Sequence, residues 1–74
     1  MSDNVPPRPL RIWTLAKGTR QAACDAHVVT LGIELVATVD DEILRTEVVR
    51  SPAAGQALAD EWRDAFVAKG WERA

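Results

Sequence analysis

The side chains best suited to chemistry lie close together in one short segment. Asp25 and His27 stand two positions apart, so on an extended strand they share a face, where a carboxylate can orient an imidazole as a general base. Acid–base catalysis also needs a pocket, whereas this pair is predicted to lie on a flat, solvated strand face. A small enzyme or enzyme subunit that uses His27 and Asp25 is therefore an alternative hypothesis, and no catalytic residue is predicted.

Cys24, the only cysteine, directly precedes Asp25. On a strand its thiol points away from the face that carries His27, which prevents a Cys/His nucleophile pair within this segment. We expect Cys24 to be a small buried hydrophobe. One cysteine and one histidine cannot supply a four-ligand zinc site, and Asp40-Asp41-Glu42 lacks the spaced oxygen ligands of a calcium loop. The sequence predicts no metal and no cofactor.

Positive charge gathers in the N-terminal part of a chain whose formal net charge is −2. An acidic chain is a poor electrostatic match for a phosphate backbone, so nucleic acid is a disfavoured partner. No G-x-x-x-x-G-K-[ST] pattern surrounds Gly18, and the cations beside it are predicted to be solvated charges of a hairpin. The runner-up function is a nucleic-acid-binding module that uses the basic N-terminal residues Arg8, Arg11, Lys17 and Arg20.

The chain has 74 residues, which leaves room for one core and one domain. A lone cysteine cannot form an intramolecular disulfide, which favours a reducing, cytoplasmic location. Residues 1–9 are polar and rich in proline, with no apolar signal sequence, and are predicted to be disordered. The most apolar stretch, 31–39, contains Glu34 and is too short to cross a bilayer. We therefore expect one soluble domain over residues 10–74.

Four segments have the alternation or the β-branched and aromatic residues typical of strands: 10–17, 21–29, 33–39 and 43–50. Turns are predicted at Gly18-Thr19, Thr30-Leu31-Gly32 and Asp40-Asp41-Glu42. Because a parallel crossover needs a dozen or more residues, such short connections require antiparallel neighbours. In the fourth segment the pattern does not decide which face is buried.

A helix is predicted from Ser51-Pro52 to about Lys69. Serine caps a free backbone N–H, and proline suits the first helical position. Gly70 suits the left-handed position beyond the last turn, and Trp71 is expected to pack back on Phe66. The helix carries an apolar stripe made of Ala54, Leu58, Trp62, Ala65 and Phe66.

That stripe presents large side chains, whereas Ala22, Cys24 and Ala26 offer a floor of small ones. Complementary packing then places Trp62 over this floor, and all three tryptophans are predicted core anchors. The predicted fold class is α+β: a four-stranded antiparallel β-meander with one C-terminal α-helix packed across one face.

Three short motifs resemble a group of small uncharacterised bacterial proteins: Trp13-x-Leu15-x-Lys17-Gly18-x-Arg20, Arg50-Ser51 and Lys69-Gly70-Trp71. Together they span most of the folded chain. The resemblance implies a strand-rich bacterial domain with a terminal helix. The group has no assigned activity, so the resemblance implies nothing about chemistry.

The first strand is predicted to be apolar on both faces, with Ile12 and Ala16 on one and Trp13 and Leu15 on the other. One helix covers one face only, so the second apolar set must be shielded by the N-terminal segment, exposed, or buried in another chain. If this strand is also an edge, its free backbone groups can pair with a partner strand. The preferred function is a non-enzymatic protein-interaction or regulatory domain, either a monomer or a weak homodimer. The predicted interaction surface comprises Arg11, Ile12, Lys17, Arg20, Arg45 and Arg50.

Overall fold

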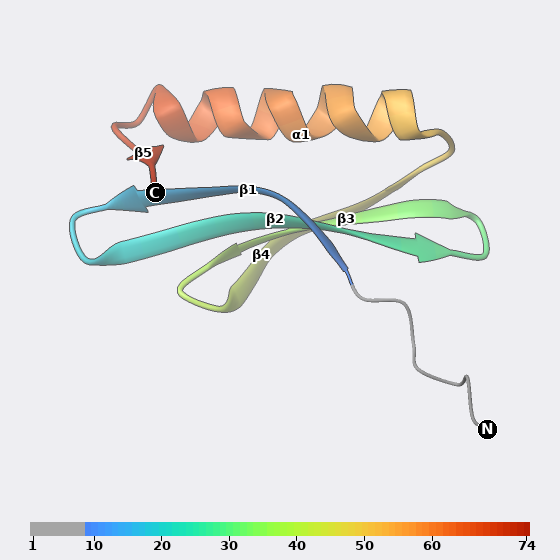
Figure 1. Ribbon diagram of the computed structural model, residues 1–74, viewed down its shortest axis with the longest axis horizontal. Helices are drawn as coiled ribbons and strands as arrows, with labels where there is room; N and C mark the ends of the chain where they lie inside the picture. The colour runs from blue at the N-terminus through green and yellow to red at the C-terminus, as the bar shows by residue number, and fades with distance from the viewer. Residues whose placement is uncertain (1–8) are drawn as a thin grey trace.

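A computed structural model describes residues 9–74, so the predicted disorder of residues 1–9 falls outside it except at Pro9. Four strands form an antiparallel meander: β1 (Leu10–Lys17), β2 (Arg20–Val29), β3 (Gly32–Val39) and β4 (Glu42–Val49). Helix α1 (Pro52–Val67) follows and lies along one face of the sheet (Figure 1). The predicted α+β fold is confirmed. Its helix of 16 residues falls short of what a bilayer crossing requires, as far as residues 9–74 are concerned.

A fifth strand, β5 (Glu72–Arg73), completes a sheet with the order β4-β3-β2-β1-β5. This strand was not expected from the sequence. The chain turns back after the helix and pairs Glu72 and Arg73 with Ala16 and Leu15 of β1. Strand β4 therefore forms one edge of the sheet, and β1 is partly covered at the other.

Both ends of the helix follow the local rules that predicted them. The Ser51 hydroxyl accepts a hydrogen bond from the Ala54 N–H at 3.1 Å, which satisfies one of the free donors at the start. The helix ends at Val67, two residues before the predicted Lys69. Beyond it Gly70 has φ +96°, and the Trp71 ring meets Phe66 edge-on at 5.4 Å between centroids.

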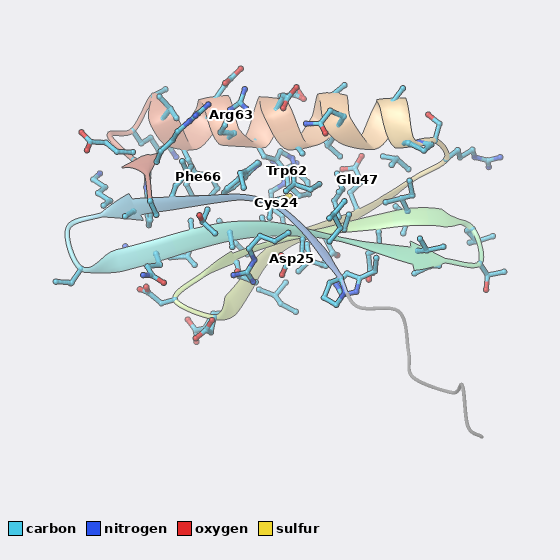
Figure 2. All side chains as sticks on the ribbon, viewed as in Figure 1. Cys24, Asp25, Glu47, Trp62, Arg63 and Phe66 are labelled. Atoms are coloured by element: carbon cyan, nitrogen blue, oxygen red, sulfur yellow. The ribbon has the colours of Figure 1, made fainter. Side chains whose placement is uncertain are left out.

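The core lies between α1 and the sheet (Figure 2) and contains all three tryptophans, as predicted. Small side chains of β2 and β3 form its floor and allow the large rings to fill the layer. The Trp13 indole crosses this layer and donates to the Ala59 carbonyl at 2.9 Å, which ties β1 to the helix. The fully buried floor and helix residues are Leu15, Ala22, Cys24, Leu35, Ala37 and Ala59.

The predicted apolar stripe of the helix is wrong in part. Ala54 and Ala65 are exposed, and Gly55 and Ala59 are buried beside Trp62. Relative to the predicted stripe, the helix is rotated about its axis. Gly55 and Ala59 are small, so the helix backbone can lie close to the sheet on that side. A Cβ added at Gly55 would lie 3.4 Å from a Val49 methyl group.

The prediction that Ile12 lies on a second apolar face of β1 is also wrong. The pairing of β1 with β2 shifts register between Arg11 and Trp13. A β-bulge places two successive residues against one on the neighbouring strand, so Ile12 packs against the same core as Trp13. Strict alternation cannot reveal such an extra residue.

Candidate interaction edge and groove

On the open face of the sheet, Asp25 of the candidate catalytic pair forms an ion pair with Arg11. Arg11 donates to both carboxylate oxygens of Asp25, from Nε at 2.8 Å and from Nη2 at 3.0 Å. These hydrogen bonds hold the pKa of the Asp25 carboxyl below its ordinary value, against partial burial, which raises it. Asp25 is therefore bound to Arg11 instead of orienting His27.

Cys24 faces the core, away from Asp25, and is fully buried as predicted. Burial first, and the Asp25 charge second, raise the pKa of its thiol to about 11. The thiol is therefore protonated near neutral pH and cannot act as a nucleophile in the folded state. Within residues 9–74, His, Cys, Asp and Glu side chains form no group of three that could hold a metal ion.

Strand β4 is the most exposed strand of the meander. Only β3 pairs with it within the described chain, so its outer backbone groups form an open edge. Three large apolar side chains project from this strand: Ile43 is 68% exposed, Leu44 58% and Val48 46%. An open edge with exposed apolar residues is a template for pairing with another strand.

The opposite edge is less available. Strand β5 pairs with β1 at Leu15 and Ala16, and the Ala74 N–H reaches the Thr14 carbonyl at 3.4 Å. Only the bulged first half of β1 stays open, and bulges hinder strand addition. The hypothesis of a free edge along β1 is therefore wrong over its second half.

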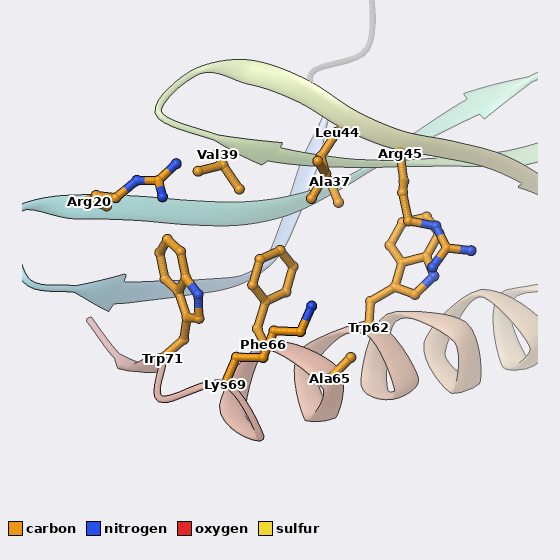
Figure 3. Close-up of a pocket in the computed structure, with 10 residues that line it drawn as sticks. All are labelled: Arg20, Ala37, Val39, Leu44, Arg45, Trp62, Ala65, Phe66, Lys69 and Trp71. Carbon is orange, nitrogen blue, oxygen red and sulfur yellow. The ribbon is translucent and has the colours of Figure 1, made fainter.

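A groove of about 410 Å³ lies beside β4, between the C-terminal half of α1 and the sheet (Figure 3). Trp62, Phe66 and Trp71 form its aromatic side, and Leu44 projects from β4 at its rim. Its charged lining residues are all cations: Arg20, Arg45 and Lys69. The groove is thus an aromatic surface with positive charge at its rim.

Arg45 joins the groove to the β4 edge. It stands opposite Ala37 on the helix-facing side of the sheet, and its guanidinium carbon lies 5.0 Å from the Trp62 ring centroid. Trp62 is only 3% exposed. Its indole Nε1–H has no hydrogen-bond acceptor among the described residues. A buried donor without an acceptor is costly, and the nearby guanidinium also only donates.

The predicted surface residues do not form one patch. Arg20 and Arg45 line opposite ends of the groove, over Trp71 and Trp62, and Arg20 also pairs with Asp40 at 3.1 Å. Lys17 donates to the Lys69 carbonyl at 2.6 Å. Arg50 follows the end of β4 and is exposed. Arg11 lies on the other face of the sheet and Ile12 in the core layer, while Arg8 lies outside the described residues.

Sequence reasoning missed the apolar residues of the β4 edge and Lys69 in the groove. A signal for the edge was present: strict alternation puts Glu42 in one set of positions and Arg45 and Glu47 in the other, so neither set has the purely apolar character of a core face. The burial of β4 confirms this, because seven of its eight residues are exposed.

Comparison with family models, curated proteins and solved structures finds no match for this chain. The resemblance to small bacterial proteins stays a prediction. The proposed function therefore rests on the geometry of β4 and the groove.

Proposed function

We propose that this domain is a non-enzymatic protein-interaction module that binds an extended segment of a partner along the β4 edge. The observation that carries the proposal is the exposure of β4, whose open backbone edge is accompanied by exposed Ile43, Leu44 and Val48. In strand addition, backbone hydrogen bonds provide affinity and alternate side chains provide specificity. Side chains of an added strand that point toward the helix would lie beside the groove.

The groove favours a partner segment that carries carboxylates. Its charged lining residues are cations, and charge complementarity selects partners and suppresses wrong ones. Arg45 and the Trp62 indole are neighbouring donors without a shared acceptor. A carboxylate beside Arg45 would accept from its guanidinium, which an alkyl or basic side chain cannot do.

The two alternatives receive less support. An enzyme that uses His27 and Asp25 would need the carboxylate that Arg11 holds. A nucleic-acid surface would need free cations on one face, but Arg11 and Arg20 each pair with an aspartate. A cytoplasmic location is part of the proposal and rests on the lone cysteine.

The proposal predicts selective binding of an acidic extended peptide. Isotope-labelled protein is titrated with a short capped valine–glutamate peptide, a valine-rich segment with one glutamate to stand opposite Arg45 and none opposite Glu47, and NMR shifts are mapped. We expect shifts along β4 and at the Trp62 indole N–H, and much weaker shifts with a valine–lysine peptide. Val48→Lys should abolish the shifts, because it places a charge among the apolar edge residues.

Val28→Lys is the matched control, because Val28 is 78% exposed but lies on β2, away from the edge. This variant should bind like the parent protein. Equal binding of the acidic and basic peptides, or shifts confined to β1 and β5, would contradict the proposal.

A further inference from the structure

The sequence of β4 is complementary to itself when read in the opposite direction. Around Thr46 stand Arg45 on one side and Glu47 on the other, and Glu42 and Arg50 lie at equal distances further out. We infer that the partner segment is β4 of a second copy, paired antiparallel about a two-fold axis at Thr46. This inference rests on the proposed function of the β4 edge and names its partner.

Charge selects this register over its neighbours. Directly opposite residues of an antiparallel pair point to the same face, so a two-fold axis passes through a residue position, here Thr46 or one of its neighbours, Arg45 and Glu47. An axis through Arg45 or Glu47 places that residue opposite its own copy, with like charges in contact. An axis through Thr46 places each Arg45 opposite Glu47 of the other copy. Opposite charges at directly paired positions stabilise a sheet, and like charges destabilise it.

The same register covers the exposed apolar residues of the edge. Strand β4 has one extra residue relative to β3 near Leu44, where Thr38 pairs with Ile43 and Ala37 with Arg45. Val48 of one copy then lies opposite the Ile43 and Leu44 bulge of the other. Two such contacts form by symmetry, as expected for an interface of one patch with itself.

The pairing also brings a carboxylate to Arg45. Arg45 and Glu47 stand opposite Ala37 and Leu35, both buried beneath the helix, so they occupy the helix-facing side. Glu47 of the second copy therefore arrives on this side, next to Arg45. Its carboxylate can accept from the guanidinium that lies over the Trp62 ring, whereas Arg45 has no ion pair within the described residues.

Single charge reversals test the register. Arg45→Glu places acids opposite acids in the dimer, and Glu47→Arg places arginines opposite arginines. In sedimentation velocity over a wide concentration series, each should raise the dimer dissociation constant on the order of tenfold to a hundredfold. The double exchange, Arg45→Glu with Glu47→Arg, restores opposite charges and should recover the dimer. Glu61→Arg on the exposed side of the helix is the matched control, and circular dichroism checks the fold of each variant.

The outcomes separate this inference from the proposed function. A protein that is monomeric throughout the series, yet binds the valine–glutamate peptide along β4, overturns the inference and leaves the function standing. If the protein dimerises and neither single charge reversal changes the dimer dissociation constant, the β4 register is wrong. If the protein neither dimerises nor binds the peptide, both proposals fail.

Discussion

Trp62→Ala is expected to lower the free energy of unfolding by about 3 to 5 kcal/mol, the range for deleting a large buried aromatic side chain. Trp62 is 3% exposed and lies in the middle of the helix face that covers the sheet. The change also removes the ring that Arg45 contacts. A domain of this size has only a few kcal/mol of stability in total, so we expect a largely unfolded protein by circular dichroism and urea denaturation.

Glu61→Ala is the matched control, since it changes the preceding, exposed position of the same helix and should alter stability by no more than about 0.5 kcal/mol. A Trp62→Ala protein with the stability of this control would show that the helix does not pack on the sheet through Trp62.

Gly32→Ala is expected to disrupt the junction between β3 and the end of β4. Gly32 has φ +144°, which side chains rarely adopt, and an added Cβ would lie 2.1 Å from the Val49 carbonyl oxygen. Backbone strain of this kind costs about 1 to 3 kcal/mol, and the overlap with backbone atoms adds to it. We expect a lower thermal midpoint and faster amide exchange at the Val49 end of β4.

Gly18→Ala provides the comparison, because Gly18 also has a positive φ, +63°, but an added Cβ there meets nothing within 4 Å. This variant should lose only about 1 to 2 kcal/mol, the cost of left-handed geometry for a side chain. Equal losses in the two variants would show that the contact with Val49 does not constrain position 32.

Local signals predicted most of the fold. Serine followed by proline marked the helix start, Gly70 marked its stop, and alternation in 21–29 placed Cys24 in the core. Each of these depends on residues adjacent in sequence, where propensity and periodicity act directly. The aromatic pair at the helix end was predictable for the same reason.

The errors concern features that depend on tertiary contacts. The bulge that turns Ile12 into the core is visible only in the pairing of β1 with β2. The rotation of the helix toward Gly55 and Ala59 follows from its close approach to the sheet. The strand β5 is two residues long, too short to show any period.

Only some residues of the candidate site were predicted from the sequence. Arg20 and Arg45 were named from charge, but they are 25 positions apart in the sequence, and only the folded sheet brings them to one groove with Lys69. The β4 edge was missed because strand order decides which strand stays unpaired. Once β4 is known to be an edge, its charge order can be read from the sequence alone.

Pairing of β4 with β4 of a second copy is tested most directly by mixing two variants. The Arg45→Glu protein carries acids at both paired positions, and the Glu47→Arg protein carries arginines at both. At a concentration where the parent protein has just become dimeric, each alone should sediment mainly as a monomer, and an equimolar mixture should form a heterodimer with opposite charges at both contacts. A mixture in which both proteins sediment as they do separately, while the parent protein dimerises, would contradict the pairing.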